Sequence, residues 1–208
     1  TGEMLVAIND MSITEHITPA FLRQHHDFIR NAAVIVVDCN ISEAALAWLM
    51  ENSGATPVFV DPVSAWKCVK ISQHLGRIHT LKPNRIEAET LSGIALSGTD
   101  DVARVADWFH QRGLKRLVLS MGGDGVYYSE KEGERGWSAP LKTQVVNVTG
   151  AGDAMMAGLA CCWLDGCSFS QAVKFAQGCS SLALSSEFTN NPELSYANVK
   201  KVVEKEYV

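Results

Sequence analysis

The sequence predicts an α/β fold with three layers, in which a mostly parallel β-sheet has helices on both faces and residues 1–208 form one domain. Short β-branched and aliphatic runs are apolar at every position, which is typical of strands buried on both sides. Helical patterns separate these runs, and this alternation is typical of βαβ units with right-handed crossovers. Of the 208 residues, 47% are hydrophobic and 20% are charged, as in a globular domain with its own core.

Four apolar runs are the predicted parallel strands. They cover residues 34–37, 57–60, 78–81 and 116–119. An earlier run over residues 4–8 has the same pattern, and the chain before it does not begin with methionine. We therefore expect the chain to begin within a larger protein.

Helices are predicted between and after these strands. Thr18 and Pro19 form a cap and a first turn, after which apolar residues recur on one face. The other predicted helices cover residues 42–50, 85–91, 99–113, 152–164, 170–185 and a closing stripe at 199–207. Residues 125–129 and 142–146 have the pattern of two strands that flank a charged, glycine-containing hairpin at 130–136.

The composition argues against several classes of function. A net charge of −5 disfavours a protein that follows a nucleic-acid backbone, so we expect no nucleic-acid partner. No apolar run approaches the roughly 20 residues of a membrane-spanning helix, so we expect no membrane partner. The six cysteines include no Cys-x-x-Cys pair, which favours reduced thiols in a cytoplasmic protein over a disulfide framework or a zinc site.

Polar side chains follow the predicted strands at the points where they end. These residues are Asp38, Asn40, Asp61, Lys82, Asn84 and Ser120. Any one of them is more commonly a loop or cap residue. Because the carboxyl ends of parallel strands share one edge of the sheet, the group together predicts a ligand crevice there.

Two segments at this edge have both a structural and a functional interpretation. Asn84 is placed to begin a helix and Glu87 to complete a capping box, but the same amide and carboxylate are suited to hold hydrated Mg²⁺ beside a phosphate. The glycines of residues 120–125, Ser-Met-Gly-Gly-Asp-Gly, serve either a tight turn or the close approach of a nucleotide. Both pairs of alternatives stay open.

The strongest motif is residues 147–153, Asn-Val-Thr-Gly-Ala-Gly-Asp, which leads directly into an apolar helix. The free N–H groups at the start of that helix form an anion site, and the helix dipole favours the ionised form of Asp153. A carboxylate beside an anion site suits phosphoryl transfer, with Asp153 accepting the proton of a hydroxyl group. The alternative is an ordinary glycine turn followed by an acidic residue.

Residues 148–154 resemble the C-terminal signature of the ribokinase-like (PfkB) carbohydrate and nucleoside kinases. Asn84-x-x-Glu87 is similar to the magnesium and phosphate motif of that family, and residues 120–125 are similar to its nucleotide-binding strand end. Gln177, in a helix of small side chains, falls where the family usually has an asparagine near the adenine. The resemblance covers essentially the whole chain, in the order of the family.

The resemblance implies a ribokinase-like fold and a kinase that uses ATP and Mg²⁺ to phosphorylate a small sugar or nucleoside. Asp153 is then the base, Gly150, Ala151 and Gly152 form the anion hole, and Asn84 and Glu87 hold Mg²⁺ through water. The implied nucleotide contacts are Asn84, Ser120, Gly122, Gly123, Gly125 and Gln177. Residues 2–11, 61–67 and 175–192 further resemble the branch of the family that phosphorylates the 5′-hydroxyl of pseudouridine.

Some parts of the chain depart from the family pattern. Asn147-Val148 replaces the usual Asp-Thr, so a K⁺ site at this loop would use the carbonyl groups of Asn147 and Thr149. Asn40 stands where relatives place a glutamate that contacts the sugar, and with Asp153 it is the implied substrate contact. The first strands of the family, its Gly-Gly sugar motif and most of its lid, through which relatives often form homodimers, have no counterpart in this sequence.

Other functions stay open at this point. Within the family, a ribokinase or another sugar or nucleoside kinase is the alternative. From another class, a non-catalytic nucleotide-binding fragment is suggested by the missing family segments. A domain with a purely structural role is the third alternative.

Overall fold

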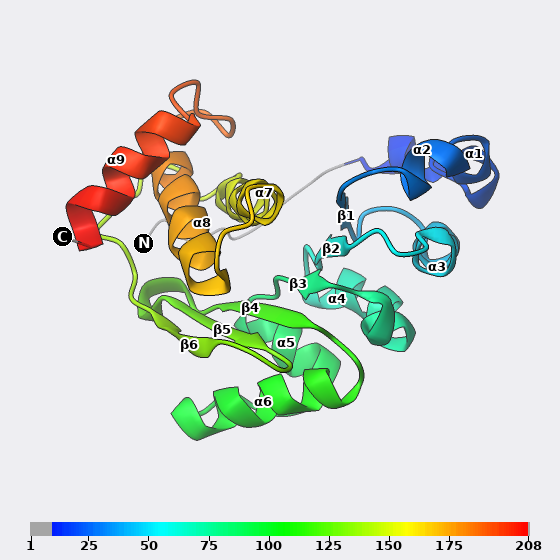
Figure 1. The fold of residues 1–208 in the computed structure, drawn as a ribbon, viewed down its shortest axis with the longest axis horizontal. Helices are drawn as coiled ribbons and strands as arrows, with labels where there is room; N and C mark the ends of the chain where they lie inside the picture. The colour runs from blue at the N-terminus through cyan, green and yellow to red at the C-terminus, as the bar shows by residue number, and fades with distance from the viewer. Residues whose placement is uncertain (1–9, 208) are drawn as a thin grey trace.

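The computed structural model describes residues 10–207, and within them a six-stranded sheet has the order β1-β2-β3-β4-β5-β6 (Figure 1). The strands are β1 (Ile35–Asp38), β2 (Val58–Asp61), β3 (Thr80–Leu81), β4 (Arg116–Ser120), β5 (Val126–Glu130) and β6 (Arg135–Ser138). Strands β1 to β4 pair in parallel, and β5 and β6 are added antiparallel. The predicted, mostly parallel sheet is confirmed, and the predicted strand at residues 4–8 lies outside the described residues.

Helices cover both faces of the sheet, as predicted (Figure 1). The helices are α1 (Pro19–Gln24), α2 (His26–Arg30), α3 (Glu43–Asn52), α4 (Ala65–Cys68), α5 (Arg85–Ser92), α6 (Thr99–Gln111), α7 (Ala151–Leu164), α8 (Phe169–Leu184) and α9 (Tyr196–Tyr207). The 3₁₀ segments of the described part are η1 (Ser12–His16), η2 (Val69–Arg77) and η3 (Gly122–Asp124). None of the helices in residues 10–207 is long and apolar enough to cross a membrane.

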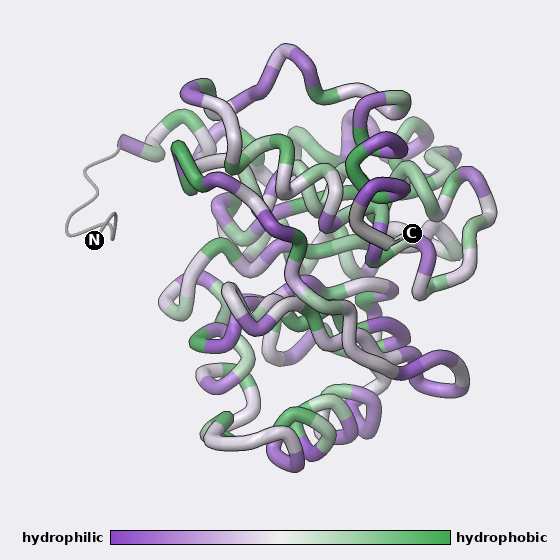
Figure 2. Tube along the Cα trace, turned by 90° about the vertical axis from the view of Figure 1, so that its left-hand side faces the viewer, coloured by the Kyte–Doolittle hydropathy of each residue, from purple (hydrophilic) through white to green (hydrophobic). Residues whose placement is uncertain are grey.

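Alternate residues of the strands enter two separate hydrophobic cores. Val58 and Val60 pack in the core beneath α3, η2, α5 and α6, whereas Phe59 between them packs in the core beneath α7 and α8. The same alternation on β4 places Leu117 in the first core and Val118 in the second. Burial on both faces therefore explains why the runs of β2 and β4 are apolar at every position, whereas β1 at the edge of the sheet leaves Val36 50% exposed. Helix α6, at the bottom of Figure 2, alternates between hydrophobic and hydrophilic residues because only one of its faces meets the sheet.

The prediction of a strand at residues 142–146 was wrong. The partner of β5 is β6 (Arg135–Ser138), so the hairpin turn is shorter than predicted. Residues 142–146 run as an irregular segment instead, because they meet α8 rather than a neighbouring strand: the backbone N–H of Val146 donates to the carbonyl group of Leu184 at 2.8 Å. The helical segment from α4 through η2 was not predicted, although Ile71 and Leu75, four residues apart, are buried on one face of η2.

His79 makes stability depend on pH. Its ring stacks on Phe59 and lies 4.4 Å from the ring of Trp163, centroid to centroid, and burial, followed by the charge of Arg116, lowers its pKa to about 4. The unfolded chain takes up this proton near pH 6.5, so stability that is complete above pH 6.5 falls as the pH decreases towards 4. Because the ring is partly exposed, we expect a loss of about 1 kcal/mol between pH 7 and pH 5. Urea unfolding at the two pH values measures this loss, and His79→Gln should make the difference smaller.

Candidate active site

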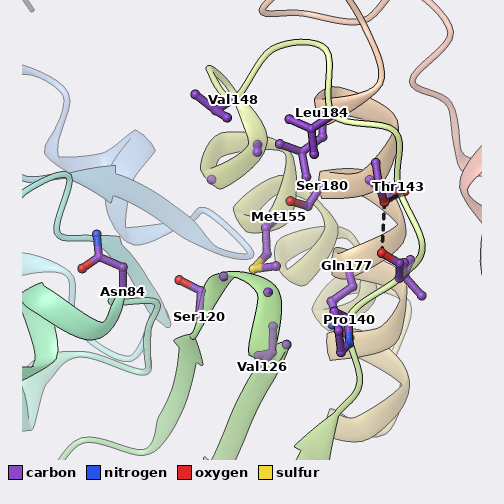
Figure 3. Close-up of a pocket in the computed structure, with 18 of the residues that line it drawn as sticks. Asn84, Ser120, Val126, Pro140, Thr143, Val148, Met155, Gln177, Ser180 and Leu184 are labelled. Atoms are coloured by element: carbon purple, nitrogen blue, oxygen red, sulfur yellow. Dashed lines mark hydrogen bonds between the residues drawn. The ribbon is translucent and has the colours of Figure 1, made fainter. Parts of the chain in front are cut away.

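A cavity of about 770 Å³ lies at the carboxyl edge of the sheet, between the ends of β3 and β4 on one side and helices α7 and α8 on the other (Figure 3). All six residues predicted to contact a nucleotide line this cavity. They are Asn84, Ser120, Gly122, Gly123, Gly125 and Gln177. From the predicted anion hole, Ala151 and Gly152 also line it. The polar strand ends and the glycine motif, which are far apart in the sequence, are therefore brought together.

The turn after β4 contains one glycine that the backbone requires, Gly125, and one with open space around it, Gly123. Gly125 has φ +91°, and a Cβ atom there would lie 2.3 Å from the carbonyl oxygen of Ser138, so the turn between β4 and β5 requires glycine at this position. A Cβ atom on Gly123 would meet nothing within 4 Å. The segment thus makes a tight turn and also leaves open space beside the cavity.

The start of α7 is fixed by a second glycine. Gly150 caps the helix with φ +85°, and a Cβ atom there would lie 2.3 Å from the carbonyl oxygen of Thr189. The first N–H groups of a helix have no partner within it, and Ala151 and Gly152, at the start of α7, line the cavity. Asp153 follows in the first turn, and its side chain is exposed.

A half-buried ion pair lies against this helix start. Nζ of Lys82 is 2.9 Å from Oδ2 of Asp61, and their side chains are 7% and 15% exposed. A Cβ atom on Gly152 would lie 3.4 Å from Nζ of Lys82. Burial, then the charge of Asp61, raises the pKa of Asp153, Lys82 lowers it, and Asp38 raises it further. Three carboxylates and one ammonium group therefore share the crevice, and sequence reasoning had not assigned Lys82 or Asp61 a role in catalysis.

The capping box predicted at α5 is present. The side chain of Asn84 accepts from the N–H of Glu87 at 2.9 Å, and Oε2 of Glu87 accepts from the N–H of Asn84 at 2.8 Å. Glu87 is 3% exposed, and burial raises its pKa. Among the described residues no group of three His, Cys, Asp or Glu side chains is placed to hold a metal ion. Of the two residues only Asn84 lines the cavity, and a role for the pair in holding hydrated Mg²⁺ stays a prediction.

Gln177 fixes one wall of the cavity. Its side-chain N–H group donates to the carbonyl group of Ala139 at 3.0 Å and lies 3.4 Å from that of Ser138. Nearby, Thr143 and Ser181 share a hydrogen bond of 2.7 Å, drawn as the dashed line in Figure 3. Sequence reasoning missed this pair, because nothing in the sequence brings residues 38 positions apart together.

Six predicted site residues do not line the cavity: Asn40, Glu87, Asn147, Thr149, Gly150 and Asp153. Asn40 lies at the end of β1, where its amide donates to Asp38 at 2.6 Å. Asn147 accepts from the N–H of Thr149 at 2.9 Å and donates to the carbonyl group of Glu187 at 3.3 Å. The side chain of Asn147 therefore joins its own loop to the segment that contains Glu187. The backbone carbonyl groups of Asn147 and Thr149 stay the predicted ligands for a cation.

Comparison with protein families identifies the chain. The model of the pfkB family carbohydrate kinases matches residues 2–195. The chain belongs to this family. It is 72% identical to the pseudouridine kinase of Escherichia coli K12 over 204 residues, which are 98% of this chain and 65% of that protein. This pfkB chain therefore spans just under two thirds of the length of that relative.

Solved structures agree with this assignment. A protein described provisionally as a sugar kinase, from Clostridium perfringens, superposes with a TM-score of 0.89 at 32% identity, over 98% of this chain and 64% of that chain. The ribokinase of Arabidopsis thaliana, solved with ribose and ATP, superposes with a TM-score of 0.74 at 21% identity, over 87% of this chain and 59% of that chain. The second likeness concerns the fold alone, and both confirm the predicted ribokinase-like architecture.

Proposed function

We propose that the protein is a kinase that transfers the γ-phosphoryl group of ATP to the 5′-hydroxyl group of pseudouridine. The observation that carries this proposal is the position of Asp153, an exposed carboxylate in the first turn of α7, next to a cavity lined by Ala151 and Gly152. The 72% identity to a pseudouridine kinase supports the choice of acceptor. A ribokinase activity has less support, since the ribokinase of Haemophilus influenzae is 25% identical to this chain.

The cavity suits ATP in size and in the character of its walls. Its volume of about 770 Å³ is within the range of small-molecule sites. Val126, Pro140 and Met155 form an apolar part in which an adenine ring would lie, close to Gln177 (Figure 3). The phosphates would then extend along Gly122 and Gly123 towards α7.

The chemistry follows from the groups around Asp153. Asp153 accepts the proton of the acceptor hydroxyl group, whose oxygen attacks the γ-phosphorus while the bond to the bridging oxygen of ADP breaks. The N–H groups of Gly150, Ala151 and Gly152 hold the charge that develops on the transferred phosphoryl group. Lys82 keeps Asp61 neutralised beside the anionic phosphates.

Two ions would assist the transfer. Mg²⁺, held through water by Asn84 and Glu87, would neutralise phosphate charge. K⁺ would bind the carbonyl groups of Asn147 and Thr149 and so steady the loop before α7. The described residues contain six free cysteines, which agrees with a cytoplasmic setting. A homodimer remains an expectation from the family resemblance.

Filling the cavity tests the ATP site. The side chain of Ser180 lies at the cavity wall on α8 (Figure 3), so Ser180→Phe should occupy the space of the adenine and abolish ATP binding in a calorimetric titration. Ser180→Ala leaves the cavity open and should bind ATP as the wild type does. Undiminished ATP binding by folded Ser180→Phe protein would place the nucleotide elsewhere.

The acid limit of activity should depend on Lys82. Burial and the carboxylate of Asp61 raise the pKa of Asp153, so turnover should fall with decreasing pH earlier than for an ordinary aspartate. Lys82 favours the ionised form of Asp153, and Lys82→Met should therefore move the acid limb of the pH profile to higher pH, in addition to lowering the rate. The profile of kcat between pH 4.5 and 8 measures this shift, and an acid limb at the same pH in both proteins contradicts it.

A further inference from the structure

Two lysines on one turn of helix reach the loop that follows β1. Nζ of Lys70 donates to the carbonyl groups of Cys39 at 3.0 Å and Ile41 at 2.9 Å, and Nζ of Lys67 donates to Oδ1 of Asn40. Both lysines are half-buried, and they come from α4 and η2, about 30 residues further along the chain. The two ammonium groups therefore hold three consecutive residues from one side.

The hydrogen bonds also fix which way the amide of Asn40 points. Lys67 is only a donor, so it must meet the amide oxygen of Asn40, and the carboxylate of Asp38 is only an acceptor, so it must meet the amide nitrogen. The backbone N–H of Asn40 donates to the other oxygen of Asp38 at 2.9 Å. One N–H and one lone pair of the amide are left with a defined orientation.

This loop lies on the acceptor side of the proposed reaction. Asp38 and Asp61 are direct partners in the parallel register of β1 and β2, and the N–H of Cys39 donates to the carbonyl group of Asp61 at 3.0 Å. A Cβ atom on Gly152, the residue before Asp153, would lie 3.7 Å from Oδ2 of Asp61, whereas Asp38, Asn40 and the two lysines do not line the nucleotide cavity. The loop that contains Asn40 is thus connected through Asp61 to the start of α7, and it lies outside the proposed ATP site.

We propose that Lys67 and Lys70 are positioning residues for the acceptor, which hold Asn40 and its loop in the orientation that binds the nucleoside. This proposal rests on the proposed function, because it assumes that the acceptor is bound beside Asp153. Lys70 sets the backbone of the loop and Lys67 sets the amide of Asn40. Neither lysine takes part in the chemical step.

Hydrogen exchange tests whether Lys70 holds the loop of residues 39–41, and it needs no substrate. Lys70→Met keeps the aliphatic stem but loses both bonds to carbonyl oxygens, so the backbone amides of residues 39–41 should exchange faster, while those of β4 are unchanged. Lys70→Arg should restore protection, since a guanidinium group also donates to two carbonyl groups. Unchanged exchange at residues 39–41 in Lys70→Met overturns the proposal, whether or not the protein is an active kinase.

Steady-state kinetics test the consequence for the acceptor. Lys67→Met and Lys70→Met should each raise KM for pseudouridine about tenfold, with KM for ATP unchanged. Lys131→Met, in the exposed turn between β5 and β6, is the matched control and should leave both constants unchanged. An equal rise of both KM values, or no rise in that for pseudouridine, overturns the positioning role. A wild-type protein that phosphorylates no acceptor refutes the proposed function instead. The exchange result still decides whether Lys70 holds the loop.

Discussion

Replacing Asp153 by asparagine is expected to lower kcat about a thousandfold and to leave the affinity for ATP unchanged. Asparagine has almost the same shape but cannot accept the proton of the acceptor hydroxyl group. Asp153 does not line the nucleotide cavity, so the substitution should not alter the affinity for ATP. ADP release with pseudouridine measures the rate, and a calorimetric titration measures ATP binding.

The matched control for this substitution is at the other end of the same helix. Asp165 follows the last residue of α7 and is exposed, so Asp165→Asn changes the same type of side chain without affecting the site. We expect it to keep the wild-type rate. A fully active Asp153→Asn protein would show that another group is the base.

Gly150→Ala is expected to lower both stability and activity. Its φ of +85° is unfavourable for alanine by about 1–2 kcal/mol. The added Cβ atom would also lie 2.3 Å from the carbonyl oxygen of Thr189, so the start of α7 must move. We expect the free energy of unfolding to fall by at least about 2 kcal/mol, and kcat to fall about a hundredfold because the anion hole is displaced. Urea unfolding and ADP release measure the two effects.

Gly166→Ala is a control that has the unfavourable backbone conformation without a steric clash. Gly166 has φ +69°, but a Cβ atom there would meet nothing within 4 Å. In this control the free energy of unfolding should fall only by the cost of a positive φ for alanine, and the activity should be unchanged. If Gly150→Ala behaves like Gly166→Ala in both measurements, the close approach of Thr189 does not hold the helix start in place.

The parts that the sequence predicts well depend on local physics. The central strands are identified by apolar runs because that part of the sheet is buried on both faces, and the α5 capping box is identified because Asn84 and Glu87 interact across one turn. Residues at strand ends converge because parallel strands share an edge. For this reason the predicted nucleotide contacts line one cavity.

The parts that the sequence does not predict depend on contacts between distant segments. Val146 bonds to Leu184, Gln177 bonds to Ala139, and Lys70 bonds to Cys39, each between side chains or backbone groups about 30 to 40 residues apart. A strand-like pattern at residues 142–146 is overridden by the first of these contacts. The role of a half-buried lysine is equally hidden, since its carbonyl partners belong to the backbone and leave no pattern in the sequence.

The most direct test of the account is ADP release from ATP and Mg²⁺ with pseudouridine, uridine, adenosine, ribose and fructose offered in parallel. We expect release with pseudouridine and background rates with the other four acceptors. Release with ribose or fructose in place of pseudouridine would keep the family and contradict the proposed substrate. Background rates with all five acceptors would contradict the proposed kinase activity itself.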